Sequence, residues 1–533
     1  MPPCGRHEFG RASFVHLSNS GAEDMALCAS TTGLLFLVST VLSYILIHFT
    51  TRVKLPESIP WTGLKSGMFK EQRAHLQELF RGRDYLAEGY SKFSKRGKAF
   101  AAPNFNFVPD IIVPPAYASW IDKQPENVLS AREGQLYFLS KYTFSHERLH
   151  RDTLEDNLAR TQQIMRLPTL HTEVMDELVA ALKDAWGSNT TEWTAVNPLE
   201  TMFYVVSRSA NRAFVGRELC RDEGFLEAVK AYVNSFATQG ILIRFFIPEL
   251  LKPLFGRLLA IPVHRRYRQL LDGYLVPLAE KLILQEDRGE ESLAKWLQAA
   301  ARSHSDPEER TAEALGGQFA SAEFAPLHTS TYSITNTLLD LLSAPQAESH
   351  LETLREEAQS LQGDPSQWTR AQVLRLELAD SVIRESLRVT RTSGKAMLRR
   401  VVAKKGVLLP DGTRLPYGVY VGLSADSHMD GDYYDDPKEF RPWRFVPDAQ
   451  KPFAAPKKMA TTSPEFLSFG NGRHSCPGRF FVAQFLTALL ACIARHYDIQ
   501  PLLERPMGHN VSDLSTPPTD ARILIRRGRD QWL

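Results

Sequence analysis

The 533-residue chain has few cysteines and no strong charge of either sign. Five cysteines, odd in number and not arranged in close pairs, argue against a disulfide framework or a zinc ribbon. Lys and Arg together number 63 and Asp and Glu 61, so the charge does not require a polyanionic partner. Nucleic-acid binding has no compositional support, and at least one cysteine is free for another role. The cysteines are Cys4, Cys28, Cys220, Cys476 and Cys492.

The chain also lacks internal repeats, low-complexity runs and any Gly/Ser linker that would separate two domains, so residues 64–533 are predicted to form one domain. Apolar residues at helical spacing dominate this part, and alternating strand patterns are few. The predicted fold class is therefore mainly α with small β-sheets. Helices are expected over 153–186, 225–246, 263–284, 311–342, 370–390 and 477–496, and strands over 104–113, 396–402 and 521–526.

A long stretch without Asp, Glu, Lys or Arg spans residues 25–49. As a helix it is long enough to cross a hydrocarbon layer of about 30 Å. A cleaved signal peptide and a buried core helix are the alternatives, but the stretch exceeds a usual signal core and no polar cleavage region follows it. Acidic residues precede it and Arg52 and Lys54 follow it, so the positive-inside rule predicts a cytosolic C-terminal domain.

The segments around this stretch are assigned by composition. Residues 1–24 are predicted to be a disordered tail. Residues 50–63 contain Pro56 and Pro60, which cannot continue a helix, and are predicted to be a stiff linker to the domain.

The sequence FLSFGNGRHSCPGRFF at 466–481 places Cys476 directly before a predicted helix. The N-terminus of a helix favours a thiolate, which is the form of cysteine that binds metals. Pro477 has no N–H, so Gly478 and Arg479 are the expected donors to the sulfur. Glycines at 470, 472 and 478 would let the backbone turn and approach a flat macrocycle closely.

Two other interpretations of Cys476 are weaker. A buried cysteine is most often a small hydrophobe, but this one belongs to a pattern of eleven residues. A zinc site needs four ligands, and no second CxxC or HxxxH is present to complete it.

The segment FGNGRHSCPGR resembles the FxxGx(R/H)xCxG signature of the cytochrome P450 family. The resemblance implies haem b, iron protoporphyrin IX, with Cys476 as the axial ligand of the iron. It also implies that His474 hydrogen-bonds a haem propionate. Two arginines lie where the family often contacts the propionates, although a surface position is the commoner fate of an arginine. The further haem-binding residues implied are Phe469, Gly478, Arg399 and Arg151.

A second motif supports the resemblance. Glu385 and Arg388 are three residues apart and share a helix face, which alone predicts only an ordinary salt bridge. In PKEFRPWRF, Arg444 has the place of the basic residue in the family's PxRF segment. The resemblance implies a buried charge triad of these three residues that fixes the loop leading to the cysteine.

The predicted helix over 311–342 aligns with the family's distal helix, whose A-G-x-(D/E)-T-(T/S) element reads APLHTS here. Pro326 replaces the glycine and His328 the acid, and a His-Thr pair is similar to that of the ent-kaurene oxidase group. The resemblance implies that Thr329, assisted by His328 and ordered water, delivers protons. Pro326 removes an N–H bond to the carbonyl of Ala322 and either opens an oxygen groove or only kinks the helix.

Two further segments have open assignments. Lys395 is expected either to meet a polar substrate group or to be solvated. Residues 236–263, rich in Ile, Leu and Phe, are expected to form a core helix and a loop that dips into the membrane.

The function implied is a haem-thiolate monooxygenase of the cytochrome P450 fold, anchored in the endoplasmic reticulum membrane by one helix. It would use O2, and electrons from NADPH passed through NADPH–cytochrome P450 reductase, to oxidise a lipophilic small molecule. A terpenoid or polyketide intermediate of fungal secondary metabolism is the expected substrate. A haem-thiolate isomerase or dehydratase that needs no external electrons, and a membrane haem protein without catalysis, remain alternatives.

Overall fold

The computed structural model describes residues 53–138, 140–144, 162, 164–247, 251–284, 290–446 and 457–528. The chain divides into two units, Met1–Arg52 and Val53–Leu533, and all described residues belong to the second. The predicted tail and the predicted membrane helix at 25–49 therefore lie outside the described residues.

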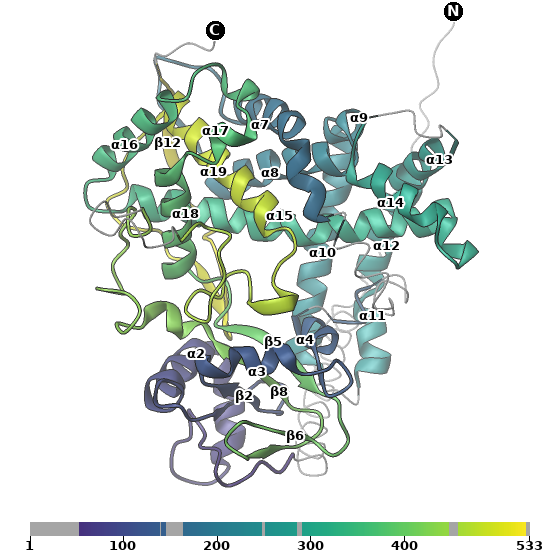
Figure 1. Ribbon diagram of the computed structural model, residues 1–533, viewed down its shortest axis with the longest axis vertical. Coiled ribbons are helices and arrows are strands. Elements are labelled where there is room, and N and C mark those ends of the chain that lie inside the picture. Colours follow the sequence, from purple (N-terminus) through teal and green to yellow (C-terminus); the bar gives the residue numbers. More distant parts are fainter. Residues whose placement is uncertain are drawn as a thin grey trace, which may run out of the picture. The chain divides into compact units, whose positions relative to one another are not determined.

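The second unit is mainly helical (Figure 1). Short 3₁₀ turns connect many of the helices, and two π-helical turns, Lys252–Gly256 and Leu271–Leu275, flank α11 and α12. The helices are α2 Lys70–Lys92, α3 Ala118–Lys123, α4 Ala131–Phe138, α7 His171–Trp186, α8 Pro198–Phe214, α9 Arg217–Cys220, α10 Glu223–Phe246, α11 Arg257–Leu259, α12 Ile261–Leu270, α13 Val276–Leu284, α14 Leu293–Arg302, α15 Ala312–Leu342, α16 Ala347–Gln359, α17 Arg370–Val373, α18 Glu377–Val389 and α19 Arg479–His496.

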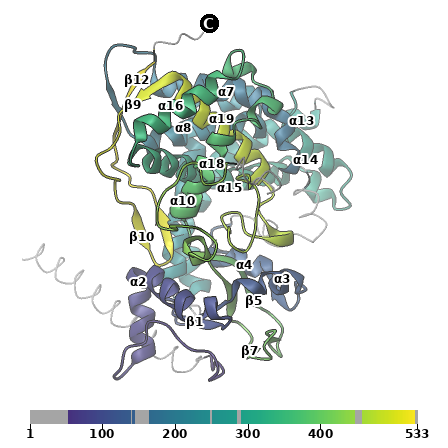
Figure 2. The same ribbon diagram turned by 60° about the vertical axis from the view of Figure 1, so that its left-hand side comes forward.

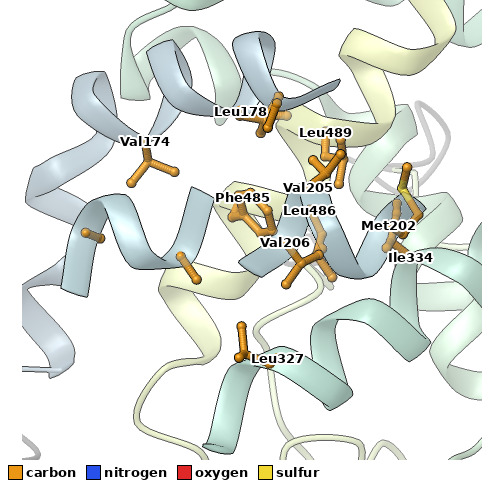
Figure 3. Packing of buried hydrophobic residues seen from close by; sticks show 14 of the residues in the cluster. Val174, Leu178, Met202, Val205, Val206, Leu327, Ile334, Phe485, Leu486 and Leu489 are labelled. Carbon is orange, nitrogen blue, oxygen red and sulfur yellow. The ribbon is translucent and has the colours of Figure 1, made fainter. Parts of the chain in front are cut away.

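The main core forms around α15, a helix of 31 residues that begins at the N-cap Thr311. This helix packs against α8, α13 and α18, and α19 packs against α16 and α18. Leu327 and Ile334 of α15 share one buried cluster with Phe485 and Leu486 of α19 and with Met202 of α8 (Figure 3). The longest helix thus has partners on several sides, which explains why it stays helical through an internal proline.

The strands of the described residues form four small sheets. The largest is mixed, in the order β1-β2-β8-β5-β3, with β2 and β8 parallel and the other pairs antiparallel. A separate buried cluster packs on this sheet. Figure 2 shows β1 and β5 of the sheet in the region of α2, α3 and α4. The other sheets are β4-β12-β9, β10-β11 and β6-β7. The strands are β1 Phe100–Ala102, β2 Asp110–Val113, β3 Leu129–Ser130, β4 Thr194–Val196, β5 Lys395–Val401, β6 Val407–Leu408, β7 Arg414–Leu415, β8 Tyr420–Ser424, β9 Tyr497–Ile499, β10 His509–Val511, β11 Leu514–Thr516 and β12 Ile523–Arg527.

The predicted fold class, mainly α with small sheets, is confirmed. The expected helices over 225–246, 311–342 and 477–496 correspond closely to α10, α15 and α19. The helix expected over 370–390 is broken into α17 and α18, because the capping box of Thr369 starts a single turn that ends before Leu374. Only the second half of the strand expected over 104–113 forms, as β2.

Several amphipathic helices, α2, α8, α14 and α16, were not predicted from the periodicity. The buried faces of α2 and α8 include polar and charged residues that a hydrophobic pattern does not count, whereas the buried residues of α16 are all apolar. In α8, for example, Arg208 and Asn211 are buried together with Val205. Burial of such residues depends on partners that are distant in sequence.

The predicted linker at 50–63 is partly built into the domain. Ile59 belongs to the buried cluster on the large sheet. The N–H of Thr62 donates to the carbonyl of Ala101 at 3.1 Å, and Thr62 is fully buried. The folded unit therefore begins at Val53 rather than at residue 64, because these hydrogen bonds add the segment to the edge of β1.

Within the described part of the chain, one helix is long and apolar enough to cross a membrane. This is α19, and 78% of it is buried inside the protein. It is therefore a core helix.

Candidate active site

The loop that carries Cys476 is shaped by glycines. Gly470 and Gly472 have φ values of 67° and 77°, in the left-handed region where a side chain is strained. The N–H of Cys476 donates to the carbonyl of Phe469 at 2.9 Å, which closes the loop. The chain then turns at Gly478, and α19 begins at Arg479. The cysteine is therefore presented just before a helix N-terminus, as the sequence predicts.

Two opposing effects act on the pKa of the Cys476 thiol. Burial raises the pKa of the thiol, whereas the N–H groups of Gly478 and Arg479 and the Arg479 guanidinium lower it. Both expected backbone donors thus reach the sulfur. A metal cation bound to the sulfur would stabilise the thiolate further, because a thiol that coordinates a metal is deprotonated.

Asp122 of α3 holds the other end of the loop. Its carboxylate Oδ1 accepts the N–H of Arg473 at 2.8 Å. A Cβ at Gly472 would lie 2.3 Å from the Asp122 carboxyl carbon, so only glycine fits there. By contrast, a Cβ at Gly478 would meet Ile164 at 3.8 Å, an ordinary contact. No crowding within the described residues therefore requires a glycine at position 478.

Two of the residues expected to bind haem propionates lie near one another. Arg399 of β5 is almost fully buried, and its Nη1 donates to its neighbour's carbonyl, that of Leu398, at 2.9 Å. Burial is the main cause that lowers the pKa of His474, and the charge of Arg399 adds to it. A propionate carboxylate would pair with the buried guanidinium of Arg399 and offset the cost of burying its charge. Arg151, the third such residue, lies outside the described residues.

Glu385, Arg388 and Arg444 come together. The Glu385 carboxylate accepts two hydrogen bonds from Arg388, at 2.8 Å each, and the Nε of Arg444 at 3.0 Å. Glu385 and Arg388 have no exposed surface. Arg388 also donates to the carbonyls of His428 and Pro437, at 2.7 and 2.6 Å. Glu385 and Arg388 are therefore not an ordinary exposed salt bridge.

Thr329 is exposed in the middle of α15, although its neighbours Leu327 and Ser330 are buried. Ala325, one turn earlier, is exposed on the same strip. The Thr329 hydroxyl donates to the carbonyl of Ala325 at 2.8 Å. Because the hydroxyl proton is used in this way, the oxygen lone pairs of Thr329 are directed outward to accept.

His328 reaches the neighbouring helix. Its Nε2 lies 2.9 Å from Oδ1 of Asn234 in α10, and its ring packs against Phe203 of α8. Burial lowers the pKa of His328 to about 4. The imidazole is therefore neutral near pH 7, and it differs in this respect from the acid that the family's element carries.

The arrangement fits a thiolate-bound haem. It offers one cysteine with two backbone donors, an arginine and a histidine for propionates, a glycine without a Cβ close to the cysteine, and an exposed strip on α15. Among the residues that the structure describes, no group of three or more His, Cys, Asp or Glu side chains could hold a metal ion.

A family model described as Cytochrome P450 matches residues 118–525. The chain belongs to the cytochrome P450 family. The family implies a haem-thiolate cofactor, a small-molecule substrate and O2.

Curated relatives match the P450 chain over most of its length. Cytochrome P450 monooxygenase lnaC of Aspergillus flavus is 31% identical over 517 residues, which cover 92% of this chain and 95% of the relative. Cytochrome P450 monooxygenase polB of Polytolypa hystricis is 29% identical over 504 residues, 89% and 94% of the two chains. The protein is accordingly an oxidoreductase of the P450 monooxygenase type.

A solved structure shares the fold. Retinoic acid bound cyanobacterial CYP120A1 superposes with a TM-score of 0.64 at 20% identity, covering 89% of this chain and all of the other. At this identity the likeness shows the fold alone.

Two residues of the P450 site have no signature in the sequence. His428 accepts the N–H of Leu467 at 2.6 Å and stacks on Phe466, which begins the cysteine loop. The Arg384 guanidinium lies 3.7 Å from the centre of the same Phe466 ring and donates to the carbonyl of Lys458 at 2.6 Å. The only sequence signal that could have identified Arg384 is its position directly before Glu385. These contacts fix the loop together with the triad.

Proposed function

We propose that this P450 monooxygenase oxidises a lipophilic small molecule, a terpenoid or polyketide intermediate of fungal secondary metabolism. The observation that carries the monooxygenase chemistry is the Cys476 sulfur, which receives two backbone N–H groups at the start of α19. The fungal origin of the relatives supports the substrate class. Electrons come from NADPH through NADPH–cytochrome P450 reductase.

Haem b supplies the oxygen activation when it is bound, and a thiolate ligand favours O–O cleavage. The chain's own residues hold the cofactor and handle protons. Cys476 would bind the iron, Phe469 and Gly478 would lie on the side of the sulfur, and Arg399 and His474 would hold the propionates. Arg151 is assigned to the same task by resemblance.

Thr329 is the residue that positions water for proton delivery. Its hydroxyl proton is engaged by Ala325, so its oxygen accepts a hydrogen bond from water and orients it. His328 is neutral and is held by Asn234, so it orients water and does not supply a proton from an acidic group. Pro326, inside α15, opens the backbone bond to Ala322 beside this strip.

We further propose that an apolar surface of the domain rests on the membrane. Phe80 of α2 is 84% exposed and Leu254, after α10, is 61% exposed. Phe105 joins the two apolar segments, because its N–H donates to Glu78 of α2 at 3.3 Å and its ring contacts Phe246 at the end of α10. Large exposed apolar groups of this kind suit lipid, and a lipophilic substrate would enter from there. The exposed side chains are Phe69, Leu76, Phe80, Phe246, Leu254 and Leu258.

The proposal places the protein in the endoplasmic reticulum membrane, with residues 25–49 as a single anchor and the domain in the cytosol. It is tested by expression with the reductase and supply of candidate terpenoids and polyketides. Substrate-induced shifts of the haem spectrum identify binders, and product mass identifies the oxidation. Products that form without NADPH would instead indicate an isomerase or dehydratase.

A further inference from the structure

A row of polar side chains lies buried between α8 and α15. Phe203, Ser207 and Asn211 are four residues apart, so they form one row along α8. Phe203 packs on His328, and the Asn211 side chain donates to Glu323 Oε2 at 3.1 Å. Ser207 lies between these two points and therefore faces the part of α15 between Glu323 and His328. The two helices lie against one another (Figure 3).

Four polar atoms in this row are buried without a hydrogen-bond partner among the residues that the structure describes. They are Glu323 Oε1, Asn211 Oδ1, Ser207 Oγ and His328 Nδ1. Glu323 and Asn211 have no exposed surface and Ser207 has 2%. Buried polar atoms are nearly always bonded to protein or to ordered water, because leaving them unpaired costs free energy. The atoms of this row therefore have the arrangement that binds internal water.

Glu323 is suited to carry a proton. Burial raises the pKa of Glu323 to about 8, and the hydrogen bond from Asn211 only partly opposes this. Among the described residues no cation pairs with the Glu323 carboxyl, and the titratable group that faces it from α10 is Tyr232, whose pKa burial raises. The carboxyl is therefore protonated near neutral pH. At the other end of the row, His328 donates from Nε2 to Asn234, so its Nδ1 is an acceptor.

We propose that Glu323 is the proton donor of this enzyme, and that water held between α8 and α15 by Ser207, Asn211 and His328 carries its proton to Thr329. Each water accepts one proton and passes another on. Glu323 Oε1 is left as a carboxylate and regains a proton from solvent, and no electron moves in this step. The inference rests on the proposed role of Thr329. The APLHTS element has His328 where the family has an acid, and Glu323 of the same helix would take the place of that acid.

The protonation state of Glu323 is tested by infrared spectroscopy, without any turnover. The wild-type protein at neutral pH should show the C=O stretch of a protonated carboxylic acid, which shifts in heavy water. Glu323→Gln should lose this band. The matched control is Glu313→Gln, because Glu313 lies on the same helix but is exposed and paired with Arg268. The band is read in the difference between the two spectra, because Glu78, whose pKa burial raises to about 7, also absorbs there. A difference spectrum of wild type and Glu323→Gln without this band overturns the proposal.

The relay is tested with the haem-loaded enzyme, its reductase and a substrate. Glu323→Gln should form several-fold less product per NADPH, release more peroxide and show a larger solvent deuterium isotope effect. The substrate-induced spectral shift should not change, since Glu323 does not touch substrate. Glu313→Gln should behave as the wild type. Unchanged coupling in Glu323→Gln overturns the relay, whereas a wild type without a thiolate-type spectrum overturns the proposed function.

A second variant interrupts the row and keeps the acid. Ser207→Val replaces the central hydroxyl by a methyl group and should cause the same uncoupling, with the infrared band of Glu323 retained. Ser209→Val is the control, because Ser209 is also buried in α8 but lies two residues away, off the row. Full coupling in Ser207→Val, or equal loss in both variants, contradicts a path through this row.

Discussion

Arg388 and Glu385 are joined by two parallel hydrogen bonds, Nε to Oε2 and Nη2 to Oε1, each 2.8 Å long, and neither side chain has any exposed surface. They are three residues apart in α18, a spacing found on any helix surface. What distinguishes this pair is its burial beneath the segment that leads to Cys476.

Glu385→Ala should prevent stable haem incorporation, although Glu385 is not proposed to touch the cofactor. The change would leave the guanidinium of Arg388 buried without its carboxylate, which costs about 3–5 kcal/mol of unfolding free energy. Urea unfolding and haem content measure the effect.

The matched control is Asp84→Ala. Asp84 pairs with Arg81 at the same three-residue spacing, but both side chains are largely exposed, at 64% and 45%. That change should cost no more than about 1 kcal/mol. Similar losses in the two variants would show that burial of the Glu385 pair has no special weight.

Cys476→Ala should abolish the thiolate-type spectrum of the reduced carbonyl complex, and turnover with it, because the only sulfur at the start of α19 is removed. Cys492→Ala is the control. Cys492 lies inside the same helix, fully buried in the core, so its loss should leave the spectrum intact. A thiolate spectrum in Cys476→Ala would refute the ligand assignment.

Thr329→Ala should keep haem and substrate binding but uncouple the enzyme, since the oxygen that positions water is removed. NADPH would be consumed with peroxide release and little product. Thr353→Ala is a control of equal chemistry, because the Thr353 hydroxyl also donates to the carbonyl one turn earlier, at 2.9 Å, but lies on α16, away from the strip on α15. Normal coupling in Thr329→Ala would remove Thr329 from proton delivery.

Glu323 should make the folded protein less stable as pH rises from about 4.5 to 8. Its pKa is about 8 when folded and 4.5 ordinarily, so in this window the unfolded chain has lost a proton that the folded protein keeps. The contribution is present in full below about pH 4.5 and is lost as pH rises, by a few kcal/mol. Glu323→Gln should remove this slope. Urea midpoints of both proteins across this range decide the matter, and parallel curves would contradict it.

The full chain should sediment with membranes and resist carbonate extraction. Deletion of residues 1–52, which lie outside the folded unit that begins at Val53, should make it extractable without loss of haem. The remaining binding to lipid vesicles should fall further when Leu254 and Leu258 are both changed to Ser. Leu503→Ser, at a fully exposed residue outside that surface, should have no effect. A soluble full-length chain would exclude the anchor.

The sequence by itself determined the cofactor-binding loop and its helix. The motif around Cys476 can be recognised in the sequence because a thiolate loop needs glycines and backbone donors within a few residues of the sulfur. The long helices α10, α15 and α19 could be predicted because the spacing of their apolar residues is a property of neighbours along the chain. The spacing of Glu385 and Arg388 was visible for the same reason.

Only the tertiary structure decided which polar residues are buried, and with which partners. Lys395 was expected to be solvated or to meet a polar substrate group, but it is buried. Its Nζ donates to Asp110, 285 residues away, at 2.7 Å, and to Tyr137 at 3.1 Å. The contacts of His428 and Glu323 likewise join distant segments. Periodicity and motifs report neighbours along the chain, whereas the ionisation of a buried group depends on neighbours in space, which folding alone brings together.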